Sequence, residues 1–593
     1  MLTEWKILKE VSEKDRCTWD LQAPSGFTIK VSLRNAEERM VYEAAMARIL
    51  DYLNASHQLP ESPEQLFGGT GPRGAREWRP GQREIALLAV ALNSMSSNNV
   101  YIDAPTGSGK SIIAMAIAHQ YMGFDENWVP GDEMAVILTL DHALQRQYAE
   151  IPAVGSITGR RNWTCTADVT KTAEDAPCTT WMRAYDCEKN KQRLCPYFLQ
   201  REQALEKPVV VTNYHYYLGA STGGDFLQPG ILICDEGHEA ERAVREFQAV
   251  SLRLDTVINP AERVRNRARG GLPHPHPTDF AGWRNLFNKQ LVEARDTHSE
   301  LFDQLHDTMR DFGEEDPMIN QLTMKLARAQ TLSRNLTKAL SLLQVGGTPL
   351  IAVEDGRVTL TPLVGNLELL DPMHNGAVFL SATIINPTIA DKFPHWFVEM
   401  PSTFPVENRP VKVLPGPKVS RKSSEQDYRK LAQDIDRILQ LHSKEKGLVH
   451  TVSYDLADTI KSFSKFPGLL INHGSGERDR AIAAFRAAPN GRALLSPSVS
   501  AGLDLPYDAC RWQAIAKLPF PNLGDPLAAA RGKAHPELAT LDTARTIVQM
   551  AGRGVRAVDD TCVTYIEDGN FKWFYRQNFE YFPKWFRDAV EFV

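Results

Sequence analysis

Nine residues near the start of the chain have the composition of a phosphate-binding loop. Residues 103–111 read D-A-P-T-G-S-G-K-S, which matches the pattern G-x-x-x-x-G-K-[ST] with Ala in place of the first Gly. The glycines let the backbone turn tightly and direct several N–H groups at one anion, and the N-terminus of a following helix adds partial positive charge. The lysine is suited to the β- and γ-phosphates and the last serine to Mg²⁺. The residues predicted to bind a nucleoside triphosphate and Mg²⁺ here are Thr106, Gly107, Ser108, Gly109, Lys110 and Ser111.

A pair of carboxylates follows a second apolar run and completes this chemistry. Asp235 and Glu236 come directly after residues 230–234, which read G-I-L-I-C. An aspartate in this place holds Mg²⁺ through water, and the glutamate polarises the attacking water. His238, two residues on, is placed to sense the γ-phosphate or to link the ATP site to a nucleic-acid site. The spacing from the phosphate loop therefore predicts a Walker B element.

Two further sets of side chains favour ATP and a site shared between domains. Arg79 and Gln82 lie upstream of the loop, and a glutamine amide suits an adenine edge because it both donates and accepts hydrogen bonds. Residues 549–556 read Q-M-A-G-R-G-V-R, so that Arg553 and Arg556 would share one face of a helix. The second half of the chain has no phosphate loop of its own. We therefore expect these arginines to stabilise the γ-phosphate from across a cleft.

Four of the eight cysteines are concentrated in one short segment. They are separated by 12, 8 and 7 intervening residues, unlike the paired C-x₂-C ligands of a zinc ribbon. Thiolates at irregular intervals still suit a soft metal, so the spacing favours metal binding and leaves open a [4Fe–4S] cluster, zinc or unliganded thiols. The cysteines are Cys165, Cys178, Cys187 and Cys195.

The elements that must position these groups alternate between strand and helix. The phosphate loop lies between the apolar run 99–102 and the helical stretch 112–118, and the strand-like run 134–140 precedes the helix-like stretch 141–148. This order predicts a parallel α/β sheet. Polar groups at the ends of such strands suit a nucleic-acid backbone, and cations among aromatic residues suit a single strand, although a solvated charged surface explains the latter equally well. The candidates for DNA binding are Thr139, Arg160, Arg161, Tyr214 and Thr383.

Composition and length set the limits for the whole chain. With 593 residues, three or four domains are expected. The net charge of −6 gives no global nucleic-acid signature, but a basic channel is compatible with an acidic protein. No apolar run approaches the roughly 20 residues that span a bilayer, and the N-terminus mixes charges into its apolar residues. We therefore expect no membrane contact and a cytoplasmic location, in a bacterial cell or an infected host cell.

The segments between the motifs differ in character. Residues 1–72 resemble a separate small module without recognisable chemistry, either an accessory binding piece or a packing extension. Long helical patterns after residue 245 indicate a helical insertion in the first α/β domain. A strand ends in Ser381-Ala-Thr383, where small hydroxyl residues suit coupling between two domains. A second α/β unit begins after residue 401.

The ordered series of motifs resembles the iron–sulfur helicases of superfamily 2, and within them the XPD/DinG family. The residues that carry the resemblance are D-A-P-T-G-S-G-K-S, the cysteine quartet, V-T-N-Y-H, D-E-G-H, L-S-A-T, S-A-G-L-D-L-P and Q-M-A-G-R-G-V-R, over about residues 75–593. The resemblance implies ATP-dependent unwinding of DNA with 5′→3′ movement on single strands. It also implies that the four cysteines hold a [4Fe–4S] cluster and that Gly502 and Asp504 join the ATP site. The catalytic set that it implies is Lys110, Asp235, Glu236, His238, Gln549, Arg553 and Arg556.

The resemblance also implies a fold of class α/β. It consists of two RecA-like P-loop motor domains with an inserted iron–sulfur domain and an inserted helical arch domain. The expected boundaries are 1–72 for the N-terminal module, 159–204 for the iron–sulfur domain, 246–345 for the arch and 401–593 for motor domain 2. Motor domain 1 takes the remaining segments, 73–158, 205–245 and 346–400.

Two departures from the family pattern concern single residues. Gly237 replaces the Ala of the usual D-E-A-H box, and Ala501 stands where the family has Glu before Gly502. The expected partners are single-stranded and forked DNA, the expected state is a monomer, and no protein partner is indicated. The alternative function is an ATP-driven single-strand translocase or nucleoprotein remodeller, on DNA or RNA, without productive unwinding.

Overall fold

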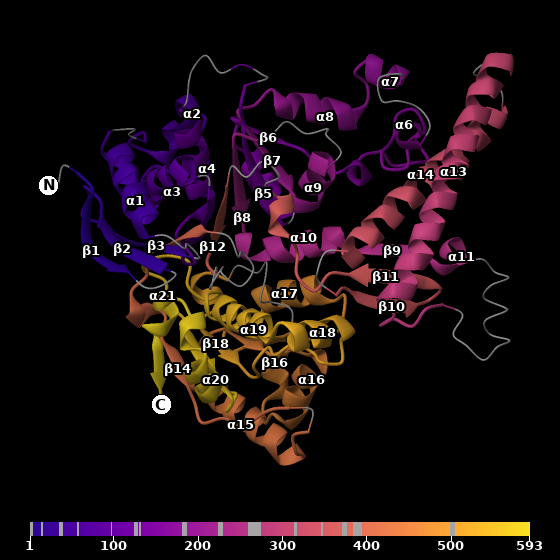
Figure 1. Ribbon diagram of the computed structural model, residues 1–593. Coiled ribbons are helices and arrows are strands. Elements are labelled where there is room, and N and C mark those ends of the chain that lie inside the picture. The colour runs from indigo at the N-terminus through magenta and orange to yellow at the C-terminus, as the bar shows by residue number, and fades with distance from the viewer. Residues whose placement is uncertain are drawn as a thin grey trace.

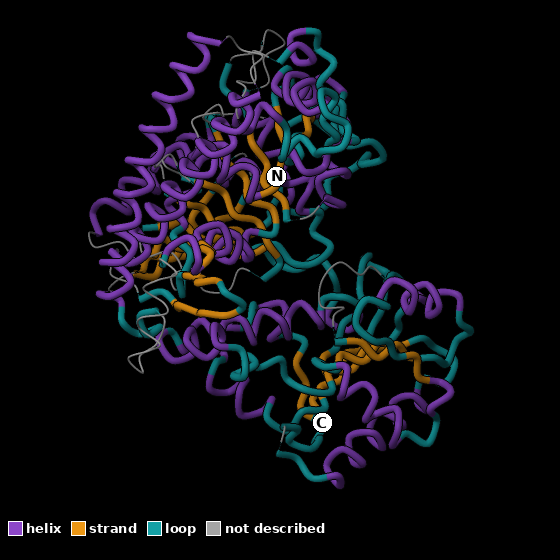
Figure 2. The backbone as a smooth tube through the Cα atoms, turned by 90° about the vertical axis from the view of Figure 1, so that its right-hand side faces the viewer, coloured by secondary structure: helices purple, strands orange, loops and turns teal. Residues whose placement is uncertain are grey.

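The computed structural model describes most of the chain in two α/β lobes (Figures 1 and 2). The first lobe carries the N-terminus and two insertions, and the second carries the C-terminus. The described residues are 4–12, 16–34, 39–55, 59–96, 98–123, 129, 132–140, 142–180, 187–222, 229–258, 274–312, 317–344, 348–370, 376–383, 394–420, 422–497 and 505–593. Gly502 and Asp504 lie outside them.

The first α/β domain is built on one large sheet, whose described strands number ten in the order β1-β2-β3-β13-β4-β12-β8-β5-β7-β6. From β13 to β6 every neighbouring pair is parallel, as the alternation of strand and helix predicts. These parallel strands are β13 (His395–Glu399), β4 (Asn99–Asp103), β12 (Ala377–Ser381), β8 (Ile231–Asp235), β5 (Ala135–Thr139), β7 (Val209–Asn213) and β6 (Val154–Ser156).

Helices cover both faces of this sheet because its central strands are apolar on both sides. In β4, Val100 and Ile102 pack in one core and Tyr101 packs in the other. The first core includes residues of α3 (Gln82–Ser96), α4 (Lys110–Met122) and α5 (His142–Ala149). The second includes residues of α9 (Tyr214–Thr222) and α10 (Ala240–Gln248).

The N-terminal residues extend this sheet instead of forming a core of their own. The strands β1 (Lys6–Ser12), β2 (Arg16–Gln22) and β3 (Thr28–Arg34) form an antiparallel meander, and β3 pairs with β13. Trp19 is buried in the same core as Trp396 of β13, with the ring centroids 6.0 Å apart. The helix α1 (Arg39–Asn54) lies beside α3 (Figure 1). The expected separate module is therefore wrong, and the packing extension describes residues 4–34.

Two insertions interrupt the first domain. A loop-rich segment holds α6 (Pro177–Thr180), α7 (Glu188–Lys191) and α8 (Pro196–Leu205). The second insertion is a long hairpin of α13 (Phe280–Phe312) and α14 (Pro317–Gln344), which projects from the body of the molecule (Figure 1). At its base, β9 (Val250–Arg253) joins β10 (Leu350–Glu354) and β11 (Arg357–Thr361) in an antiparallel sheet. β11 thus pairs with β9 across the expected boundary at residue 346.

The second α/β domain has a parallel sheet with the strand order β16-β17-β15-β18-β19-β14-β20 in the part of the chain that the structure describes. The strands are β14 (Val411–Val413), β15 (Gly447–His450), β16 (Leu470–Ile471), β17 (Ala493–Ser496), β18 (Trp512–Ile515), β19 (Val563–Ile566) and β20 (Val590–Phe592). The helices are α15 (Glu425–Leu441), α16 (Tyr454–Phe463), α17 (Arg478–Ala487), α18 (Pro526–Ala534), α19 (Pro536–Ala551), α20 (Phe571–Gln577) and α21 (Lys584–Arg587). This confirms the second α/β unit. None of the described helices combines the length and apolarity needed to cross a bilayer.

Candidate active site

The phosphate loop has the predicted order of strand, tight turn and helix. It connects β4 to α4, and Lys110 is the first residue of that helix. Gly107 and Gly109 have φ angles of 81° and 76°, which residues with a Cβ rarely adopt. The loop therefore directs its backbone N–H groups and the N-terminus of α4 at the space in front of it, which suits a phosphate.

Gln82 and Arg79 bind the phosphate loop itself. The side-chain amide of Gln82 donates to the carbonyl oxygen of Ser108 at 2.8 Å and accepts from the backbone N–H of Arg79 at 2.9 Å. The guanidinium of Arg79 donates to the carbonyl oxygen of Gly107. One end of the Gln82 amide thus holds the loop and the other accepts from the backbone of Arg79, and the contact of these two residues with adenine stays a prediction.

The acidic pair lies at the end of β8, opposite Lys110. Oδ1 of Asp235 accepts from the backbone N–H of Glu236 at 2.9 Å, and Oδ2 accepts from the hydroxyl of Tyr148 at 2.7 Å. Glu236 has a φ of 50° and turns its carboxylate to within 3.8 Å of Nζ of Lys110. The two carboxyl groups therefore share one cation and differ in their surroundings.

The surroundings separate the pKa values of the two acids. Burial, and then the charge of Glu236, raise the pKa of Asp235 to about 6. Burial also opposes ionisation of Glu236, but the positive charges of Lys110 and Arg553 hold the pKa of Glu236 below its ordinary value. Glu236 is therefore the more ionised of the two carboxylates.

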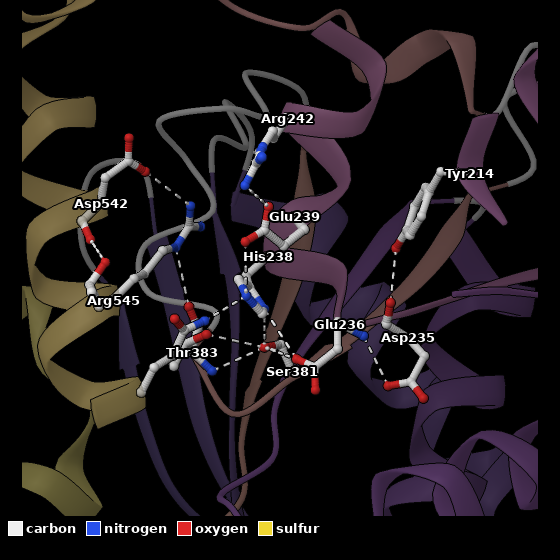
Figure 3. Close-up of polar contacts among 12 residues, drawn as sticks. Tyr214, Asp235, Glu236, His238, Glu239, Arg242, Ser381, Thr383, Asp542 and Arg545 are labelled. Atoms are coloured by element: carbon white, nitrogen blue, oxygen red, sulfur yellow. Dashed lines mark hydrogen bonds and ion pairs between the residues drawn. The ribbon is translucent and has the colours of Figure 1, made fainter. Parts of the chain in front are cut away.

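A chain of hydrogen bonds joins this pair to the second domain (Figure 3). Nε2 of Gln549, on α19, lies 2.7 Å from Nε2 of His238, and Nδ1 of His238 lies 2.6 Å from Oγ of Ser381. The Ser381 hydroxyl in turn donates to Glu236 at 3.5 Å. Since an amide N–H donates to His238, the imidazole accepts at Nε2 and carries its proton on Nδ1. Burial lowers the pKa of His238 to about 4, which keeps this ring neutral.

The arginines after Gln549 lie in a turn beyond the helix. We expected Arg553 and Arg556 on one helical face, but α19 ends at Ala551. Glycines at 552 and 554 favour this early end. A Cβ on Gly552 would lie 2.7 Å from Oγ1 of Thr106, so the turn touches the phosphate loop. The effect of Arg553 on the pKa of Glu236 likewise indicates that its charge lies near the acidic pair.

The four clustered cysteines have free thiols in one small domain. Cys165 is buried and the other three are partly buried. Nη1 of Arg160 lies 3.6 Å from Sγ of Cys178, and burial raises the pKa of the Cys178 thiol. Among the described residues, no three His, Cys, Asp or Glu side chains are arranged around a common metal position. The metal ligation of these cysteines stays a prediction.

The candidate DNA-binding residues divide by burial. Thr139, Tyr214 and Thr383 are buried, and the Tyr214 hydroxyl donates to the carbonyl oxygen of Asp235 at 3.1 Å. Arg160 lies over the ring of Tyr197 at 4.4 Å and is partly buried, whereas exposed Arg161 pairs with Glu174 at 2.8 Å. Their contact with nucleic acid stays a prediction.

Family models and solved structures agree with this architecture. A model described as a helicase C-terminal domain matches residues 436–589, and a DEAD_2 model matches residues 163–257. The structure of Xpd4 from S. tokodaii is 14% identical, with a TM-score of 0.50, and the match covers 87% of this chain and 100% of that one. A structure described as an XPD helicase is also 14% identical, with a TM-score of 0.52 and coverage of 87% and 99%. Comparison with the curated proteins finds no match.

The chain carries the two helicase domains that these models describe, in a fold like that of the XPD structures.

The two α/β domains are accordingly RecA-like motor domains of an ATP-dependent helicase, and the phosphate loop and the acidic pair lie where the two domains meet. Sequence reasoning missed two side chains of this helicase that contact the predicted residues. Tyr148 contacts Asp235, and Arg545 contacts the carbonyl oxygen of Thr383 at 3.2 Å. Tyr148 ends the helix-like stretch 141–148 and Arg545 lies just before the motif 549–556, but neither belongs to a motif with a recognisable spacing.

Proposed function

We propose that the chain is an ATP-dependent DNA helicase that moves 5′→3′ on single-stranded DNA. The observation that carries the proposal is the chain of contacts from Gln549 through His238 and Ser381 to Glu236. It links one motor domain to the carboxylate that would polarise water on the other. The preference for DNA and the polarity are what the resemblance to the XPD/DinG family implies.

In this proposal ATP is held between the two motor domains. The phosphate loop and Lys110 bind the β- and γ-phosphates, and Arg553 and Arg556 approach the γ-phosphate from the other domain. Because Gly552 abuts Thr106, closure of the cleft and delivery of the arginines are one movement. After hydrolysis the cleft reopens, and residues at the strand ends advance along the single strand.

Ser111 and Asp235 would hold the Mg²⁺ of the nucleotide. The Tyr148 hydroxyl is hydrogen-bonded to both side chains, so a hydroxyl and a carboxylate lie within reach of one oxygen atom. This pair of hard oxygen ligands fits Mg²⁺. When bound, the ion neutralises charge that develops on the phosphates.

The four cysteines would hold a [4Fe–4S] cluster with a structural role. Four free thiols in one short segment fit a set of soft-metal ligands. Burial raises the pKa of the Cys178 thiol, and the guanidinium of Arg160 beside it counters part of that effect. A cluster would give rigidity to a segment that has only short helices around it. Measurement of iron and acid-labile sulfide in anaerobically purified protein tests this part, and stoichiometric zinc would refute it.

Unwinding of forked substrates tests the function. Forks with only a 5′ tail or only a 3′ tail, in DNA and in RNA, are incubated with ATP, and we expect separation of the 5′-tailed DNA fork alone. Lys110→Ala, which leaves the loop backbone in place, is expected to abolish both unwinding and nucleic-acid-stimulated ATP hydrolysis. Displacement of a bound protein without strand separation would instead favour the translocase alternative. RNA unwinding or 3′→5′ movement would correct the substrate or the polarity.

A further inference from the structure

Arg545 occupies the contact between the two motor domains without reaching the nucleotide loop. It lies on α19, one turn before Gln549, and its side chain is only 16% exposed. Nε donates to the backbone carbonyl of Thr383 at 3.2 Å, and Nη1 lies 4.0 Å from Asp542 on the same helix (Figure 3). The planar guanidinium thus bridges its own helix and the end of β12 in motor domain 1.

The peptide that Arg545 holds also orients the hydroxyl beside Glu236. The backbone N–H of Thr383 donates to Oγ of Ser381 at 3.1 Å. That same oxygen receives the bond from His238 and donates to Glu236. A shift of the backbone at Thr383 would therefore move the Ser381 oxygen away from its partners. Gln549 reaches the same hydroxyl through His238, so two residues one turn apart on α19 act on one atom.

We propose that Arg545 is a positioning residue that transmits closure of the motor domains to Glu236 through Thr383 and Ser381. The proposal rests on the ATP-driven function above, and it adds a second contact to the one between Gln549 and His238. Arg545 does not contact the phosphate loop in the part of the chain that the structure describes. Its loss should therefore slow hydrolysis more than it weakens ATP binding.

The charges around Arg545 make the contact sensitive to domain separation. Asp542 belongs to motor domain 2, whereas Glu239 and Glu241 belong to motor domain 1, and all three act on its charge. Burial lowers the pKa of Arg545, and these carboxylates counter that effect. Opening of the cleft would remove two of the three carboxylates while the guanidinium stays on α19. In the closed arrangement the carboxylates therefore offset part of the cost of burying the guanidinium.

Arg531 provides a matched control. It also crosses between the domains, with Nη1 3.1 Å from Glu241 and a second hydrogen bond to the carbonyl oxygen of Leu363. In the part of the chain that the structure describes, Arg531 makes no hydrogen bond or ion pair with residues 381–383. An effect that arises from any interdomain ion pair would appear in both arginine variants, whereas an effect through Ser381 would appear only at Arg545.

The test measures kcat and KM for ATP with saturating single-stranded DNA. We expect Arg545→Gln to lower kcat at least tenfold with KM within twofold. Arg545→Lys should be nearly as slow, because a single ammonium lacks the fork that joins Thr383 to Asp542. Arg531→Gln should keep kcat within threefold. The double variant Arg545→Gln with Ser381→Ala should be no slower than the slower single variant, since both changes break one route.

Three outcomes would overturn the role of Arg545. These are a kcat within threefold of the native value for Arg545→Gln, an equal loss for Arg531→Gln, or multiplied losses in the double variant. If the native protein shows no stimulation by DNA or RNA, the proposed function fails. The role of Arg545 is then decided by small-angle scattering with a non-hydrolysable ATP analogue. The native protein must become more compact and Arg545→Gln must not, and equal compaction of both would overturn the role.

Discussion

The hydroxyl of Tyr148 donates a hydrogen bond of 2.7 Å to Oδ2 of Asp235. Tyr148 is buried on α5, and its hydroxyl is also hydrogen-bonded to Ser111. The same helix follows β5, whose last residue, Thr139, is a candidate for DNA binding. Tyr148 therefore links α5, the helix after this strand, with Ser111 and Asp235, the two residues proposed to hold Mg²⁺.

Replacement of Tyr148 by Phe should weaken the use of Mg²⁺. A hydrogen bond to a charged group contributes about 1.5–3 kcal/mol, so we expect the Mg²⁺ concentration for half-maximal ATP hydrolysis to rise roughly tenfold or more. Tyr214→Phe is the control, because the Tyr214 hydroxyl donates to the backbone of Asp235 and spares its carboxylate. Equal shifts in both variants, or none in Tyr148→Phe, would contradict this role.

A methyl group at Gly552 should hold the motor domains apart. Its Cβ would lie 2.7 Å from Oγ1 of Thr106, whereas the φ of −76° at Gly552 is accessible to alanine. Gly552→Ala should therefore lower kcat for ATP hydrolysis at least tenfold and leave the melting temperature within a few degrees. Gly532→Ala on α18 is the matched change, because its Cβ would meet no atom within 4 Å. Full activity of Gly552→Ala would show that hydrolysis does not need this contact.

Acid should destabilise the protein through His238. Its pKa is about 4 in the folded protein and about 6.5 when unfolded, so the unfolded chain takes up a proton that the folded chain does not. The destabilisation is absent above pH 6.5 and grows as the pH falls to 4, to about 3 kcal/mol. The melting temperature should therefore fall less between pH 7 and pH 4.5 for His238→Gln than for the native protein.

This comparison isolates His238 from the other buried histidines. His119 and His450 have pKa values lowered to about 4 by burial, but both remain in the variant. His276→Gln, at an exposed position, serves as the control and should follow the native pH dependence. Parallel curves for the native protein and His238→Gln would mean that the ring is protonated in the folded state as readily as in the unfolded one.

Loss of Trp19 should destabilise motor domain 1. Its side chain is 1% exposed and packs against Trp396, and removal of a buried aromatic ring costs about 3–5 kcal/mol. Trp19→Ala should therefore lower the melting temperature of the domain that carries the phosphate loop. Leu8→Ala, on the exposed strand β1, should change it little, because Leu8 is 55% exposed. An unchanged transition in Trp19→Ala would restore the idea of an independent module.

The sequence predicts the local structure of the phosphate loop and the acidic pair, because each of these motifs is contiguous. The phosphate loop and the pair Asp235–Glu236 each follow an apolar strand directly, so strand order alone brings them to one edge of the sheet. The arginines are less predictable, because the glycine at 552 ends α19 before Arg553. For Gln82, the sequence indicates an amide that donates and accepts, but not that the loop itself is its partner.

Contacts between distant segments are what the sequence does not predict. Arg545 and Tyr148 are single residues on helices, and their partners lie 162 and 87 positions away. Nothing in the strand pattern of residues 28–34 indicates that β13 is the neighbour, because alternation identifies a buried face without identifying the adjoining strand. For the same reason, the sequence does not predict that β9, β10 and β11 pair at the base of the helical hairpin.

The pairing of β3 with β13 has a consequence for synthesis on the ribosome. Lys30 lies opposite Glu399, so one of the first strands to leave the ribosome pairs with one made roughly 370 residues later. At about 5–20 residues per second this delay lasts roughly 20–75 seconds. During that time β3 and β4 each have one edge without its partner strand, because β13 pairs with both. Both insertions also leave the ribosome before β13. Motor domain 1 therefore completes its sheet only when nearly 400 residues have been translated, and the nascent chain must be protected from edge-to-edge association until then.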